Sequence, residues 1–195
     1  MKRRLIHFGV VLVSLLPLLA LGIGALGDGL GADPIERITH TTGEWGLRML
    51  LCSLAITPLR RFTGLAVLAP YRRTFGLLAF SYATLHLLTY VGLDQTFDWA
   101  LLLEDVLERR YVTAGFAAWL CLLPLALTST RGMIKRLGQR WRVLHRLAYV
   151  AGVLGVVHYL WLVKADLVPP ILHGLVLALL LGARRLPRRS QHQNA

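Results

Sequence analysis

The chain has 195 residues, of which 55% are hydrophobic and only 16% are charged, and its formal net charge is +12. A soluble domain carries roughly 25% charged residues, so the composition excludes a soluble protein and indicates one whose solvent is mostly lipid. The basic residues are divided among short segments between apolar runs. That distribution is typical of membrane topology and argues against binding to nucleic acid.

Six apolar segments are each close to the about 20 residues that a helix needs to cross a bilayer. Backbone polar groups must be satisfied inside lipid, so we expect helices and an all-α membrane protein. The first segment is longer than the roughly 7–15 apolar residues of a signal peptide, so we expect it to be retained. The segments cover Leu5–Leu26, Trp45–Leu59, Phe75–Leu93, Val112–Leu127, Val143–Val163 and Leu167–Ala183.

The loops between these segments orient the bundle. With the N-terminus in the cytoplasm, 17 of the 22 basic residues fall on the cytoplasmic side and all ten acidic residues fall outside. Lys and Arg are enriched in the cytoplasmic loops of membrane proteins, so we predict a six-transmembrane-helix bundle with both termini cytoplasmic. A single domain over residues 1–186 is expected, followed by a basic cytoplasmic tail over residues 187–195. No internal repeat is evident.

Two histidines lie inside apolar segments, His86 in the third and His158 in the fifth. Both segments run outward, and the residue counts to Asp94 and Lys164 place the two imidazoles roughly 9–12 Å below the outer surface. A polar side chain in hydrocarbon is costly and imidazole binds iron well, so the level pair predicts the axial ligands of a haem between two helices. The alternative for each is a hydrogen bond to a carbonyl or hydroxyl neighbour.

A third histidine, His145, lies thirteen residues before His158. That spacing places it roughly 20 Å nearer the cytoplasmic surface along a helix. If His145 ligates iron, it belongs to a second haem, but its counterpart on the third segment falls at Arg72 or Arg73. The sequence therefore contains no second pair of histidines, and an interfacial role or a contact with haem propionates is an equal alternative for His145.

Five stretches of the chain are distinctive in combination. They are GADPIERITHTTG (31–43), ITPLRR (56–61), YATLHLLTY (82–90), LTSTRGMIKRLGQRWRVLHRLAY (127–149) and HYLWLVKAD (158–166). Together they resemble the MsrQ (YedZ) family, the haem-binding membrane subunit of bacterial periplasmic methionine sulfoxide reductase systems, within the wider group of ferric-reductase-like transmembrane domains. The wider group carries two histidines on its third helix, where this chain has one.

The resemblance implies cofactors, partners and a location. It implies that His86, His145 and His158 bind b-type haem, with one haem expected and a second if His145 ligates iron, and that flavin mononucleotide (FMN) is also bound. It implies a non-catalytic electron-transfer subunit in the bacterial inner membrane. The donor would be the quinone pool or a cytoplasmic flavin reductase, and the acceptor a periplasmic molybdopterin subunit that reduces methionine sulfoxide in envelope proteins.

Two other functions stay open at the level of sequence. The first is metal-ion or oxygen reduction by transmembrane electron transfer on the same scaffold. The second is a proton-coupled transporter that uses the histidines as a relay. Transporters usually show internal repeats or helices broken at the midplane, and the prolines of this chain are not paired in that way.

Overall fold

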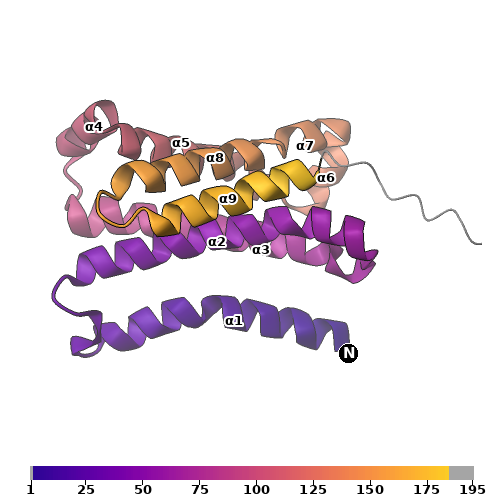
Figure 1. Cartoon of the computed structure of the whole chain (residues 1–195), viewed down its shortest axis with the longest axis horizontal. Helices are drawn as coiled ribbons and strands as arrows, with labels where there is room; N and C mark the ends of the chain where they lie inside the picture. Colours follow the sequence, from indigo (N-terminus) through magenta and orange to yellow (C-terminus); the bar gives the residue numbers. More distant parts are fainter. Residues whose placement is uncertain (1, 185–195) are drawn as a thin grey trace, which may run out of the picture.

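The computed structural model describes residues 2–184, and every regular element in that range is helical. Long helices lie side by side along one axis, and shorter helices cover the ends of the bundle (Figure 1). The predicted tail, residues 187–195, lies outside the described residues. The long helices are α1 (Lys2–Ala25), α2 (Pro34–Thr63), α3 (Ala69–Thr89), α5 (Arg110–Leu127), α8 (Leu147–Leu162) and α9 (Val168–Ala183); the short ones are α4 (Trp99–Glu108), α6 (Arg131–Leu137) and α7 (Gln139–Leu144).

The two ends of the bundle differ in charge. The end that holds residues 26–33, 90–109 and 163–167 carries most of the acidic side chains and is called the acidic end below. The opposite end holds residues 60–73, 128–146 and Arg184, and is called the basic end. Helix α4 lies at the acidic end, whereas α6 and α7 lie at the basic end (Figure 1).

Helix α2 is longer than the sequence analysis predicts, because it begins at Pro34 and not near Trp45. The Asp33 side chain accepts a hydrogen bond from the Glu36 backbone N–H at 2.9 Å, and proline occupies the first turn. Both features favour a helix start at this point. The helix ends at Thr63, and the next residue, Gly64, has a φ of 72° that is readily adopted only by glycine.

The fifth predicted segment is interrupted and is not one continuous helix. Helix α7 ends at Leu144 and α8 begins at Leu147, so His145 and Arg146 lie at the break. The loops around residues 94–110 and 128–142 contain α4, α6 and most of α7. Short helices thus cover both ends of the bundle and position His145 independently of α8.

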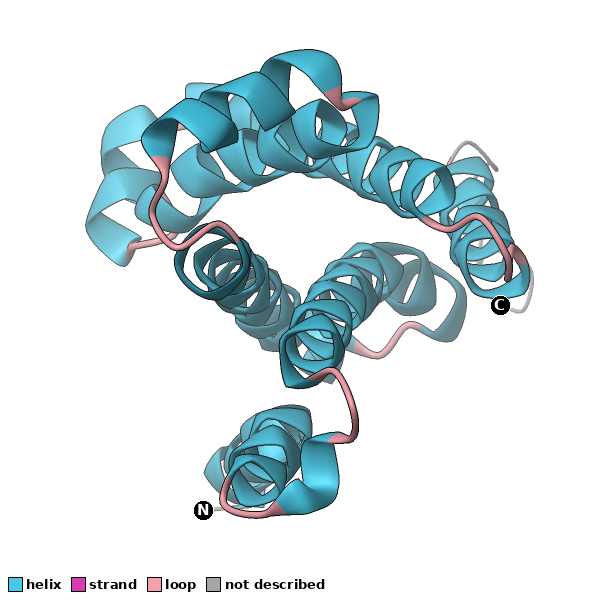
Figure 2. Ribbon diagram, turned by 90° about the vertical axis from the view of Figure 1, so that its left-hand side faces the viewer, coloured by secondary structure: helices cyan, strands magenta, loops and turns pink. Residues whose placement is uncertain are grey.

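The core is built from two helical hairpins. Helix α2 packs against α3, helix α5 packs against α8, and α9 lies beside α2 and α8. Helix α1 stands at the edge of the molecule (Figure 2), where the Tyr82 hydroxyl donates a 2.6 Å hydrogen bond to the Ser14 carbonyl. The buried core includes Leu50, Leu54, Ala79, Tyr82, Leu122, Leu125, Ala151 and Leu177.

Membrane-spanning length and hydropathy distinguish the helices. The segments long and apolar enough to cross a membrane are Arg4–Ala25, Ala66–Asp94, Arg110–Leu127 and Gln139–Leu162, and α9 is a shorter apolar helix. Large apolar side chains on α1 and α9 face outward, as lipid contact requires. The described residues confirm a multi-pass, all-helical membrane protein. The count of six crossings stays a prediction.

Orientation is tested by labelling one exposed position at each end. With Cys52 and Cys121 replaced, we expect Glu104→Cys in α4 to react with a membrane-impermeant maleimide in spheroplasts that retain an intact inner membrane. We expect Lys135→Cys in α6 to react only after that membrane is permeabilised. The reason is that Lys and Arg concentrate at the basic end, which the positive-inside rule places in the cytoplasm. Labelling of Lys135→Cys in intact spheroplasts would contradict the orientation.

Candidate functional site

His86 on α3 and His158 on α8 face each other between the two hairpins. Their ring centroids are 5.9 Å apart, and the ring planes make an angle of 79°. Both side chains are partly buried. The structure therefore brings together the two histidines that the sequence places at equal depth. Whether they ligate a haem iron stays a proposal.

Each of these two imidazoles is fixed by a backbone carbonyl. His86 Nδ1 lies 2.8 Å from the Thr39 carbonyl oxygen, and His158 Nδ1 lies 2.7 Å from the Tyr111 carbonyl oxygen. A carbonyl oxygen only accepts hydrogen bonds, so Nδ1 carries the proton in both rings and Nε2 keeps a free lone pair. Metal-ligating histidines are held in this way, because the bond fixes the tautomer and raises the basicity of the ligating nitrogen.

A glycine lies against each imidazole, one helical turn after the carbonyl that fixes it. A Cβ atom on Gly43 would lie 3.0 Å from His86 Nδ1, and a Cβ atom on Gly115 would lie 2.6 Å from His158 Nδ1. Both distances are shorter than ordinary van der Waals contact, and the second is a clash. The close approach of α2 to His86 and of α5 to His158 therefore requires a residue without a side chain.

One constant shift of 72 residues relates the two histidine environments, so the α2–α3 and α5–α8 hairpins are equivalent units. The sequence analysis missed this repeat. Its signal is the recurrence of glycine 43 residues before histidine, a spacing too sparse to be noticed as sequence similarity. The shift converts Thr39, Gly43 and His86 into Tyr111, Gly115 and His158, and it converts the buried Leu50 and Ala79 into the buried Leu122 and Ala151.

The ligand set fits a haem better than a bare metal ion. Protein sites for a single metal ion usually supply three or four ligands, and residues 2–184 contain no group of three or more His, Cys, Asp or Glu side chains suited to one. A haem needs only axial ligands, because the porphyrin supplies the others. His86 and His158, with ring centroids 5.9 Å apart, are the residues that would supply those axial ligands. The buried hydroxyl of Thr39, beside His86, has no partner within the described chain.

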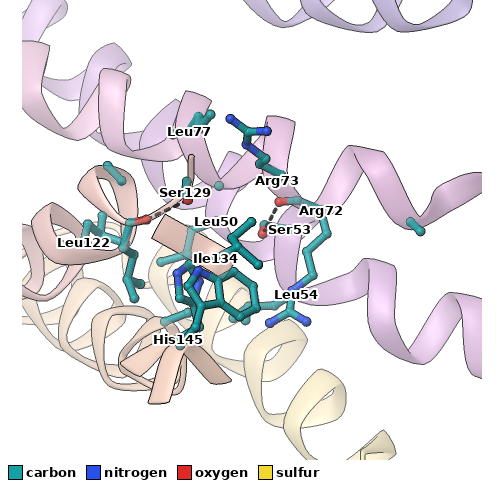
Figure 3. Close-up of a pocket in the computed structure, with 16 residues that line it drawn as sticks. Leu50, Ser53, Leu54, Arg72, Arg73, Leu77, Leu122, Ser129, Ile134 and His145 are labelled. Atoms are coloured by element: carbon teal, nitrogen blue, oxygen red, sulfur yellow. Dashed lines mark hydrogen bonds between the residues drawn. The ribbon is translucent and has the colours of Figure 1, made fainter. Parts of the chain in front are cut away.

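A second candidate site lies at the basic end. It is a cavity of about 180 Å³ with His145, Trp141, Arg72 and Arg73 in its wall (Figure 3). The side chains of Arg72 and Arg73 extend in different directions from α3, and that of Arg72 runs towards Leu54. The other lining residues are Leu50, Ser53, Leu54, Ala69, Gly76, Leu77, Leu122, Leu125, Ala126, Ser129, Ile134 and Ala148.

The His145 ring is held differently from the paired histidines. The Thr128 hydroxyl donates to the Pro124 carbonyl at 2.6 Å and lies 3.2 Å from His145 Nε2, so Nε2 donates the proton and Nδ1 keeps the lone pair. The Trp141 ring stacks on the imidazole at 3.8 Å between centroids. Under the 72-residue shift the counterpart of His145 is Arg73, so this cavity offers one imidazole and arginines, and no second histidine.

Two hydrogen-bonded carboxylates near the acidic end, the half-buried Glu44 and the buried Asp105, were not identified from the sequence. Glu44, next to Gly43, accepts a hydrogen bond from the Tyr159 hydroxyl at 2.8 Å. Asp105 on α4 is only 4% exposed, accepts from the Tyr90 hydroxyl at 2.5 Å, and pairs with Arg109 at 2.9 Å. The Asp105 contacts attach α4 to the end of the bundle nearest His86 and His158.

Comparison with known proteins gives consistent matches. Residues 42–156 match the family described as ferric reductase like transmembrane component. The protein-methionine-sulfoxide reductase heme-binding subunit MsrQ of Rhodospirillum rubrum is 52% identical, over 95% of this chain and 90% of its own length. The proteins of that name from Xanthomonas axonopodis pv. citri and Xanthomonas oryzae pv. oryzae are 52% and 54% identical, over 85% and 80% of this chain and 76% and 72% of their own lengths.

Proposed function

Because the chain belongs to the MsrQ family of heme-binding subunits, within the ferric-reductase-like transmembrane proteins, we propose that it is a membrane b-type cytochrome that passes electrons to a methionine sulfoxide reductase. One observation supports the haem most directly. His86 and His158 face each other with both Nδ1 protons engaged by carbonyls, so two Nε2 lone pairs are free for one iron. A bound haem supplies one-electron redox chemistry.

The chain itself supplies position and orientation. Thr39 and Tyr111 carbonyls hold the imidazoles, and the glycines beneath them let the helices approach. We propose six crossings of the bacterial inner membrane with both termini and the basic end in the cytoplasm, which places His86 and His158 nearer the periplasm. The domain then comprises residues 1–186, with residues 187–195 as a basic tail.

Electrons are proposed to reach this site from the basic end. The donor is the quinone pool or a cytoplasmic flavin reductase, and the inner cavity at His145 is the place for an intermediate cofactor, either FMN or a second haem. Support comes from Trp141, whose ring stacks on His145, and from Arg72 and Arg73 in the same wall. Arginine pairs well with the phosphate or carboxylate groups that both cofactors carry.

The acceptor is proposed to be the periplasmic molybdopterin subunit, docked at the acidic end. Helix α4 carries exposed acidic side chains there and is held to the bundle through Asp105. Charged groups on a docking face steer association and set its salt dependence. This chain has no proposed role in binding the sulfoxide itself.

Purification and reconstitution test this function. We expect a red protein whose extracted haem is b-type, and whose reduced spectrum is reoxidised when the periplasmic subunit and methionine sulfoxide are both added. The periplasmic subunit without sulfoxide is the control. A colourless protein carrying no haem would exclude the cytochrome and favour the proton-coupled transporter instead.

Replacement of Gly115 tests the role of helix approach. We expect Gly115→Ala to weaken haem binding, because the new Cβ would lie 2.6 Å from His158 Nδ1 and would displace the imidazole. The expected loss is about 10–100-fold, the size of effect seen when a metal-ligating side chain loses a hydrogen bond that orients it. Gly43→Ala should have a smaller effect, at 3.0 Å from His86 Nδ1. Gly132→Ala is the control, since nothing lies within 4 Å of its added Cβ. Haem per protein after purification is the measurement, and equal content in all three variants would contradict the role.

A further inference from the structure

Three arginines gather at the basic end from helices that are distant in sequence. Arg61 lies in the last turn of α2, Arg72 in the first turn of α3, and Arg184 directly after α9. Arg61 Nη1 donates to the Arg184 carbonyl at 3.0 Å. Burial lowers the pKa of the Arg184 guanidinium, and the nearby Arg72 charge adds to this lowering against an opposing effect of Tyr149. The ion pairs found within residues 2–184 involve none of the three.

Arg184 is held rigidly with its guanidinium turned into the bundle. Its Nη2 donates to the Leu54 carbonyl at 2.5 Å, and its Nη1 donates to the Tyr149 hydroxyl at 2.5 Å. The guanidinium carbon lies 4.8 Å from the centroid of the Tyr149 ring. Leu54 is 1% exposed, so this cation is anchored against the core. A guanidinium held in this way is not a freely solvated surface arginine.

Two donors in this cluster have no partner among residues 2–184. The Nε atoms of Arg61 and Arg184 are both buried, and neither is hydrogen-bonded within the described chain. A buried charged donor without an acceptor costs more than a neutral one. An anion with several oxygen atoms would satisfy both donors and reduce the repulsion between the guanidiniums. The planar fork of arginine matches phosphate oxygens especially well.

We propose that Arg61, Arg72 and Arg184 form a binding site for a phosphate group at the basic end of the bundle. The phosphate belongs either to an anionic phospholipid headgroup or to a soluble phosphate ester such as FMN. Basic pockets between helices on the cytoplasmic side of a membrane bind anionic headgroups. Arg72 also lines the inner cavity beside His145, so the bound group borders that cavity. The site needs no haem at His86 and His158, and only its FMN arm rests on the proposed function, which places that cofactor beside Arg72.

Binding is measured on the full-length protein in two arms. In the first, the protein is reconstituted in nanodiscs of phosphatidylcholine with or without phosphatidylglycerol, and retained lipid is identified by native mass spectrometry after release. In the second, delipidated protein is titrated with FMN and with inorganic phosphate. We expect Arg61→Gln to weaken binding about tenfold, as loss of a hydrogen bond to a charged group predicts. The arm that shows this loss identifies the source of the phosphate.

The matched control is Arg131→Gln, which removes one exposed cation from α6 at the same end. It should leave binding unchanged in both arms. Arg61→Gln is preferred to an Arg184 variant because Arg184 also anchors α9 to Leu54. The far-ultraviolet circular dichroism of Arg61→Gln must match that of the unmodified protein. Equal binding by Arg61→Gln and the unmodified protein, an equal loss in Arg131→Gln, or no binding in either arm would overturn the proposal.

Discussion

His86→Ala and His158→Ala are each expected to abolish most haem binding while the protein still inserts in the membrane. The two imidazoles face each other at 5.9 Å with free Nε2 atoms, so removal of either leaves the iron with one axial ligand. Loss of a hydrogen bond to a metal-ligating side chain already lowers metal affinity about 10–100-fold. Loss of the ligating side chain itself lowers it further. Haem per protein, measured on purified variants, is the test.

A third buried histidine provides the matched control. His173 on α9 is 9% exposed, and its Nδ1 lies 2.7 Å from the Pro169 carbonyl oxygen of its own helix. His173→Ala thus removes a buried, carbonyl-bonded imidazole that does not face His86 or His158. Full haem content is expected in this variant. Wild-type haem stoichiometry in either His86→Ala or His158→Ala would refute the paired ligation.

The equal depth of the two histidines was predictable because depth in a membrane follows from counting residues. A helix rises by about 1.5 Å per residue, so the positions of His86 and His158 relative to the outer charges placed both at one level. Their facing orientation was not predictable, because it depends on how α3 and α8 rotate when they pack. The carbonyl partners, Thr39 and Tyr111, each lie 47 residues before the histidine that they bind. These hydrogen bonds become evident only once the helices have packed as hairpins.

The start of α2 is predicted by its local capping residues but not by hydropathy. Asp33, Pro34 and Glu36 form a typical helix start, but the following turns are polar, so hydropathy alone predicts an apolar segment only from Trp45 onward. The arginine cluster had no such signal. Arg184 and its acceptor at Leu54 are separated by 130 residues, and a basic residue after a membrane helix predicts only orientation.

The break between α7 and α8 changes how His145 is understood. In a continuous helix, the thirteen residues between them would turn His145 away from the face that carries His158. The structure places the interruption at His145 itself, with the ring held by Thr128 and Trp141 in the cavity wall. His145 is therefore positioned by the basic end of the bundle and not by the helix that carries His158.

His145→Ala is expected to keep the haem at His86 and His158 but to slow its reduction by a quinol or a cytoplasmic flavin reductase. By helix rise, His145 lies roughly 20 Å from the proposed haem ligand His158. A cofactor held in the inner cavity would shorten that gap, and His145 is the one imidazole in the cavity wall. Stopped-flow reduction by the physiological donors, compared with reduction by dithionite, measures the effect. Dithionite should reduce the variant and the unmodified protein at equal rates.

Lys135→Ala on α6 serves as the control, because it removes an exposed group at the same end without touching the cavity wall. Equal haem content and equal donor-dependent rates in His145→Ala would show that this imidazole only anchors the break between α7 and α8. Loss of all haem would show instead that His145 is a ligand of the same iron, and that the pairing of His86 with His158 is wrong. Slow reduction with full haem content is the outcome that places electron input at the inner cavity.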